Sequence, residues 1–177
     1  MAAERRSTDT ASESTPAAVR ELVIERSFDA PRELVFKAWT EPERLMRWWG
    51  PKGFTTLNCT IDLRPGGVMH FCMRSPDGQD IWCKGVYQEI VAPERIVCTS
   101  CFSDAEGNLV QPTHYGLSAD WPAETLMSVT FDEQDGKTKL TLRQAGVPMT
   151  PERSGAVQGW TESFDRLAAY VAAEAPA

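Results

Sequence analysis

The segment IERSFDAPRELVFKAWTEPERLMRWWGPKGF, residues 24–54, carries more structural information than any other part of the chain, because it joins a strand, two short helices and a tryptophan pair. Apolar and polar side chains alternate weakly over residues 22–29, which is typical of a half-buried strand. Pro31 then provides the φ favoured in a first helical turn, and apolar residues recur at helical spacing as far as Trp39. We therefore predict a strand followed directly by a helix.

A second short helix is predicted immediately after the first. Thr40 and Glu43 have the spacing of a capping box, in which each side chain accepts a hydrogen bond from an unpaired amide at the start of a helix. This helix is expected to end near Trp48, Trp49 and Gly50.

Beyond Phe54 the chain is predicted to form six strands, two of them before residue 75 and the last over residues 137–145. Pro65-Gly66-Gly67 and Asp77-Gly78 mark turns between them. In each strand apolar and polar residues alternate, so every second side chain is assigned to the inner face of the sheet. The residues expected to face inward are Leu57, Cys59, Ile61, Leu63, Met69, Phe71, Met73, Ile81, Cys83, Gly85, Tyr87, Met127, Val129, Phe131, Leu140 and Leu142.

A long helix is predicted at the C-terminal end, from Thr150-Pro151-Glu152 to about Ala173, because a hydroxyl cap, a proline and an acid mark its first turn. Its apolar residues recur at spacings of three and four and are all expected to be mostly buried: Val157, Trp160, Phe164, Leu167 and Val171. Together these elements predict an α+β domain, with the helix on one face of an antiparallel sheet.

Composition is compatible with one domain over residues 19–174, since 42% of the 177 residues are apolar. Residues 1–18 contain no Leu, Ile, Val or Phe and are expected to form a disordered tail. The net charge of −7 argues against nucleic acid or an anionic membrane as a partner. Because neither a membrane-spanning run nor a signal peptide is recognisable, we expect a cytoplasmic protein.

The cysteine pattern predicts reduced thiols. The chain has five cysteines, an odd number, and no export signal. Cys98 and Cys101 lie in an expected strand, where positions three apart point to opposite faces, so the CxxC spacing does not form a redox or zinc site. We expect no metal and no cofactor.

Residues 103–124 form an unusually long connection that contains aromatic and apolar side chains. One interpretation is a lid at the mouth of a pocket, with His114, Tyr115, Leu117 and Trp121 touching a ligand or partner. The other is a loop whose aromatic residues pack on the outer sheet. His114 could act as an acid or base, but no spacing defines a nucleophile beside it, and a lone loop histidine is more often solvated.

Large apolar side chains from the sheet and the C-terminal helix are expected to converge. They could line a ligand pocket or form a filled core, and both need the same residue types. The candidate ligand-binding residues are Phe71, Met73, Tyr87, Met127, Phe131, Trp160 and Phe164, with His114 at the mouth. We expect no catalytic residue among them.

Several motifs carry a family resemblance: FDAPRELVFKAW (28–39), TEPERLMRWWGP (40–51), IDLRPGG (61–67), GVYQEI (85–90), PERI (93–96), GW (159–160) and FDRLAAY (164–170). Together they resemble the activator of Hsp90 ATPase homologue-like branch of the START-like (SRPBCC, pollen-allergen-like) superfamily over about residues 20–172. The resemblance implies a helix-grip fold, a curved antiparallel sheet around a long C-terminal helix with a pocket between them. It also implies a link to the stress response, but no common catalytic residue.

Three functions from different classes are compatible with these observations. The first is a non-enzymatic module that holds a small apolar or aromatic molecule between sheet and helix. The second, suggested by the resemblance, is a module that interacts with a chaperone of the Hsp90 type. The third is a cyclase- or aromatase-like enzyme, for which the inner face offers few acids or bases beyond Tyr87 and His114. We rank them in that order.

Overall fold

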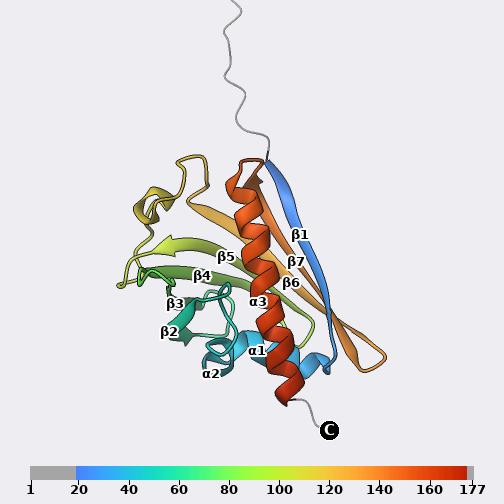
Figure 1. Ribbon diagram of the computed structural model, residues 1–177. Helices are drawn as coiled ribbons and strands as arrows, with labels where there is room; N and C mark the ends of the chain where they lie inside the picture. The colour runs from blue at the N-terminus through green and yellow to red at the C-terminus, as the bar shows by residue number, and fades with distance from the viewer. Residues whose placement is uncertain (1–18, 175–177) are drawn as a thin grey trace, which may run out of the picture.

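A computed structural model describes residues 19–174, in which a seven-stranded antiparallel sheet curves around a long helix (Figure 1). The strands are β1 (Val19–Phe28), β2 (Thr55–Ile61), β3 (Val68–Arg74), β4 (Asp80–Val91), β5 (Arg95–Ser103), β6 (Glu124–Gln134) and β7 (Lys137–Pro148). The helices are α1 (Arg32–Thr40), α2 (Pro42–Leu45), the 3-10 helix η1 (Pro112–Tyr115) and α3 (Glu152–Glu174). The tail expected at residues 1–18 lies outside the described residues.

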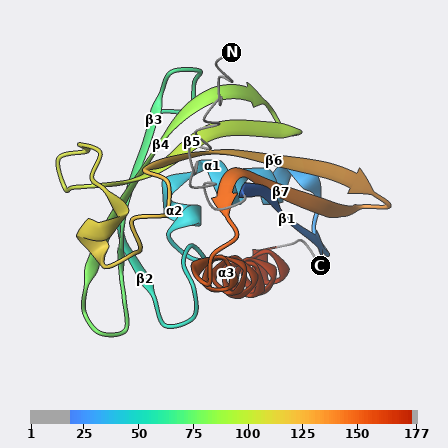
Figure 2. The ribbon, with the colours of Figure 1, turned by 90° about the horizontal axis from the view of Figure 1, so that it is seen from above.

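The sheet order is β1-β7-β6-β5-β4-β3-β2, so the first strand pairs with the last and every other neighbour follows in sequence. Figure 2 shows the sheet bending around α3, with α1 and α2 close to the concave side. This is the predicted helix-grip α+β architecture. Within residues 19–174, no helix combines the length and the apolar character that crossing a bilayer requires.

The apolar stripe of α3 is confirmed only over its C-terminal half. Phe164, Leu167 and Val171 are buried in the core, and Trp160 is partly buried against it. The prediction that Val157 is mostly buried is wrong, because 39% of its surface is exposed. Because a helix has 3.6 residues per turn, the stripe can continue from Trp160 to either position 156 or position 157. Here it continues through Ala156, which lines the cavity described below.

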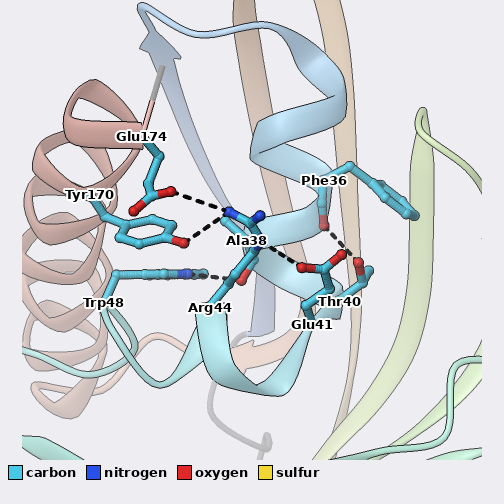
Figure 3. A network of polar contacts seen from close by, with 8 residues as sticks. All are labelled: Phe36, Ala38, Thr40, Glu41, Arg44, Trp48, Tyr170 and Glu174. Atoms are coloured by element: carbon cyan, nitrogen blue, oxygen red, sulfur yellow. Dashed lines mark hydrogen bonds and ion pairs between the residues drawn. The ribbon is translucent and has the colours of Figure 1, made fainter. Parts of the chain in front are cut away.

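The capping box is not formed. α1 continues through Thr40, whose hydroxyl donates to the Phe36 carbonyl oxygen at 3.0 Å instead of capping the next helix (Figure 3). Glu41 stands at the N-cap of α2 and makes no side-chain cap. Because an N-cap needs extended backbone, a residue inside one helix cannot cap the next.

Polar contacts connect α2 to the end of α3 (Figure 3). The Arg44 guanidinium donates to the Tyr170 hydroxyl at 3.1 Å and to the Glu41 carboxylate, and it lies 3.8 Å from the Glu174 carboxylate. The neighbouring Trp48 indole donates to the Ala38 carbonyl oxygen at 3.0 Å. The Arg44 contacts hold α2 against the end of α3, and the Trp48 contact holds the turn after α2 against α1.

A β-bulge changes the predicted face of β2. The pairing of β2 with β3 shifts between Thr56 and Asn58, so Leu57 is the extra residue and is 42% exposed. Thr56 is buried instead and donates to the Trp49 carbonyl oxygen at 3.0 Å. Leu63 is also exposed, because it lies in the turn beyond the end of β2. The inward assignment is therefore wrong for both leucines.

The other inward assignments are confirmed by burial. Met73, Ile81, Cys59 and Ile61 are partly buried and pack on the core. The buried set is Met69, Phe71, Cys83, Gly85, Tyr87, Met127, Val129, Phe131, Leu140 and Leu142.

The predicted hydroxyl cap of the C-terminal helix is not formed. The buried hydroxyl of Thr150 has no hydrogen-bond partner among residues 19–174 and therefore caps nothing.

Candidate ligand-binding site

A cavity of about 550 Å³ lies between the N-terminal half of α3, the inner face of β3–β7 and the segments around Trp49 and Trp121. It exists because one face of α3 carries small side chains there: Gly155, Ala156 and Gly159 all line it. A Cβ atom built on Gly155 would meet nothing within 4 Å. Because these side chains are small, they do not fill the space between this half of α3 and the sheet.

Aromatic rings form one end of the cavity. Trp49 and Trp160 meet almost perpendicularly, with ring centroids 5.4 Å apart and an interplanar angle of 87°. Phe71 packs on Trp49 at 5.1 Å, and the buried Trp39 stacks behind Trp160 at 6.1 Å. Such edge-to-face and stacked contacts are favourable for aromatic pairs and hold each ring in one orientation. The rings therefore present a rigid aromatic wall.

Few polar groups line the cavity, and most of them already have partners. The Gln144 amide donates to the Thr125 hydroxyl at 2.8 Å. The Ser163 hydroxyl donates to the Gly159 carbonyl oxygen of its own helix at 2.8 Å. The walls are otherwise mostly apolar, as in sites that bind small organic molecules.

Arg166 fixes the cavity wall formed by residues 49–54. One guanidinium nitrogen of Arg166 lies 2.9–3.3 Å from the carbonyl oxygens of Trp49, Gly50, Pro51 and Phe54 and donates to them. All four of these residues line the cavity. Partial burial lowers the pKa of Arg166, but a guanidinium still remains charged at neutral pH.

The connection between β5 and β6 closes another side. Tyr115, Leu117 and Trp121 line the cavity, whereas His114 is exposed and does not. The Tyr115 hydroxyl donates to the Ser103 carbonyl oxygen at 2.6 Å and accepts from the Trp82 amide at 3.1 Å. The loop is thus bound to the sheet while its apolar side chains face the cavity, a placement that favours the lid interpretation.

The structure divides the predicted ligand-binding residues into two groups. Phe71, Met73 and Trp160 line the cavity. The other core residues, Tyr87, Met127, Phe131 and Phe164, are buried away from it. α1 contributes to filling that region, since Phe36 packs on Phe131 at 5.4 Å.

Sequence reasoning missed several wall residues, among them Phe54, Phe102, Gln144 and Gly155. The glycines could have been found from sequence. Gly155, Ala156 and Gly159 share one helical face, and small residues on an inward face indicate either close packing or space.

The five cysteine thiols are free and do not form a reactive site. Cys83 lines the cavity, and burial raises the pKa of Cys83 and Cys98 to about 12 and of Cys59 to about 11. Burial also raises the pKa of the Tyr87 hydroxyl, which has no hydrogen-bond partner among the described residues. Protonated thiols are weak nucleophiles, so these groups are apolar wall and core at neutral pH.

These thiols predict a loss of stability at alkaline pH. Their folded pKa values lie above the ordinary value near 9, so the unfolded chain releases protons first as the pH rises. The stabilisation is complete below pH 9 and is lost between about pH 9 and 12, at about 1.4 kcal/mol per pH unit for each buried thiol. Urea unfolding from pH 8 to 11, under reducing conditions, measures this slope. The double variant Cys83→Ala/Cys98→Ala should flatten it; equal slopes in both proteins would contradict the assignment.

An antiparallel sheet that curves around a long C-terminal helix, with a mainly apolar cavity between them, is the helix-grip fold of the START-like, or SRPBCC, superfamily. Within this superfamily the chain belongs to the family described as Activator of Hsp90 ATPase homolog 1-like protein, whose model matches residues 29–172. The resemblance inferred from the motifs is therefore confirmed.

Solved structures share the fold. A Chromobacterium violaceum protein is 28% identical, with a TM-score of 0.69 over 85% of this chain and 96% of that one. An AHSA1 protein from Silicibacter pomeroyi is 24% identical, with a TM-score of 0.69 over 88% and 99%. An Arthrobacter aurescens protein is 23% identical, with a TM-score of 0.70 over 92% and 94%. No curated protein matches the chain.

Proposed function

We propose that the protein is a non-enzymatic module that binds a small apolar or aromatic molecule in the cavity between α3 and the sheet. The main support is the cavity itself, whose 550 Å³ lies within the usual range for small-molecule sites. Its wall of Trp49, Trp160 and Phe71 is suited to a flat ring, because offset and edge contacts with aromatic faces stabilise such ligands.

The lining favours binding over acid–base catalysis. Among the described residues that line the cavity, Glu152 is the one carboxylate and no histidine is present. The Tyr115 hydroxyl is already engaged in two hydrogen bonds with the backbone. A cyclase- or aromatase-like reaction would need a second acid or base close to the substrate.

Filling the cavity should abolish binding without unfolding the protein. Gly155→Leu adds a side chain where the cavity is open, and replacing a helical glycine removes a residue that costs about 0.5–1 kcal/mol in a helix. N-phenyl-1-naphthylamine, an uncharged fluorescent probe, should bind the unchanged protein tighter than about 1 mM and the variant at least about tenfold more weakly. Fluorescence titration measures both dissociation constants.

The matched control is Ser154→Leu, which adds the same side chain at an exposed neighbouring position outside the cavity. It should bind the probe within about twofold of the unchanged protein, because the added side chain lies outside the cavity. Equal binding to the Gly155→Leu variant would remove the cavity as the site. If a broad screen of aromatic and lipid-like compounds gave no ligand tighter than about 1 mM, the chaperone-interacting alternative suggested by the family description would replace this proposal.

A further inference from the structure

The cavity has an asymmetric charge. Glu152, in the first turn of α3, is the one charged residue in its lining, and its carboxylate makes no ion pair or hydrogen bond with another residue of the described chain. The two arginines closest to it along α3 are engaged elsewhere. Arg153 donates to the carbonyl oxygens of Arg20, Glu21 and Val147, and Arg166 donates to those of residues 49–54. No lining side chain can therefore neutralise an anionic ligand.

The carboxylate and the aromatic wall lie on the same face of α3. Glu152, Ala156 and Trp160 follow at intervals of four residues and all line the cavity. The helix rises 1.5 Å per residue, so Glu152 and Trp160 are separated by about 12 Å along its axis. The first turn of α3 and the loop between β5 and β6 lie at the same end of the molecule (Figure 1). The site thus has an aromatic inner end and an acidic outer end.

We propose that the cavity selects elongated aromatic amines, with the ring against Trp49 and Trp160 and the ammonium group near Glu152. This inference rests on the proposed ligand-binding function and adds the chemical class of the ligand. A carboxylate attracts an ammonium group and repels an anion, and the effect is larger where apolar walls reduce the local dielectric. Aromatic side chains add to the preference, because their faces attract cations; Trp121, from the loop, is a third tryptophan in this lining.

Three probes that share a phenyl ring and a five-carbon chain test the charge preference: 5-phenylpentylamine, 5-phenylpentan-1-ol and 5-phenylpentanoate. Calorimetric titration at pH 7 should give the tightest binding for the amine, intermediate binding for the alcohol and the weakest for the carboxylate. We expect the amine to bind at least about tenfold more tightly than the carboxylate. High salt should reduce this ratio, because ions screen the charge of the partly exposed Glu152.

Variants of Glu152 separate charge selection from cavity binding. Glu152→Gln should weaken the amine by about five- to tenfold and leave the alcohol within about twofold, and Glu152→Lys should make the carboxylate bind more tightly than the amine. Glu133→Gln, which removes the same charge from an exposed site outside the cavity, should change none of the three.

If the alcohol binds but the amine binds no better, or if Glu152→Gln leaves their ratio unchanged, charge selection is overturned while the cavity function stands. If none of the three probes binds while N-phenyl-1-naphthylamine does, the ligand class proposed here is overturned and the cavity function stands. If neither that probe nor the broad screen gives a ligand, both proposals are overturned.

Discussion

Replacement of Phe164 by alanine is expected to lower the free energy of unfolding by about 3–5 kcal/mol. The Phe164 side chain has no exposed surface, and its ring packs on Phe28 at 6.1 Å, on Trp160 at 5.6 Å and on Trp39 at 6.2 Å. It does not line the cavity, so its removal opens a new void. Trp39 and Trp160 cannot easily move in to fill that void, because each is held by other aromatic contacts. Urea or thermal unfolding measures the loss.

The control for this variant is Val157→Ala, two turns earlier on the same helix. Val157 is 39% exposed, so its truncation should change the stability by no more than about 0.5 kcal/mol. A loss below about 1.5 kcal/mol for Phe164→Ala would mean that the core around α3 is loosely packed. A large loss of stability for Val157→Ala would instead indicate that Val157 is buried, as its place in the apolar stripe predicts.

Most of the fold could be predicted because its signals are local and repeated. Alternation along β3, β4, β6 and β7 identified the inward side chains correctly, and Pro31 marked the start of α1. The order of motifs along the chain indicated the family, which the match over residues 29–172 confirms. These features depend on neighbours in sequence, so periodicity and turn residues are sufficient to find them.

The errors arose where the course of the backbone departs from the one that a local pattern predicts. Leu57 was placed inward by strict alternation, but a bulge beside it adds one residue to β2 and shifts the faces. Thr40 has the spacing of a cap, yet it bonds back to Phe36 because α1 continues through it. Neither a bulge nor the last residue of a helix has a reliable signature in a single sequence.

The candidate site was harder to predict than the core, because a cavity depends on which inward positions remain uncovered. Trp160 and Phe164 are one turn apart with similar apolar character, yet the first faces the cavity and the second lies in packed core. The difference comes from α1, which packs on the sheet beside Phe131 and leaves the region of Phe71 open. Sequence periodicity defines a face of an element but does not show how far along that face the partner extends.

Replacement of Arg166 by methionine is expected to destabilise the protein by about 2–4 kcal/mol and to weaken ligand binding as well. Methionine keeps much of the apolar length but removes a nitrogen whose two N–H groups are shared among four carbonyl oxygens. A charge-assisted hydrogen bond contributes about 1.5–3 kcal/mol before other partners compensate. Thr56 still donates to the Trp49 oxygen and the Phe54 amide to the Pro51 oxygen, which limits the loss. Arg166→Lys should recover part of it, because an ammonium group has three donors.

Measuring both stability and ligand binding in the Arg166→Met variant distinguishes a role of Arg166 in positioning the cavity wall from a purely structural role. Trp49, Pro51 and Phe54 line the cavity, so a looser segment should weaken N-phenyl-1-naphthylamine binding even under conditions in which the variant remains folded. Arg143→Met, which removes an exposed arginine 3.2 Å from Glu21, should cost less than about 1 kcal/mol and leave probe binding unchanged. If Arg166→Met lost stability but bound the probe normally, residues 49–54 would hold their positions without the guanidinium, and the wall would be fixed by the packing of Trp49 on Phe71 and Trp160.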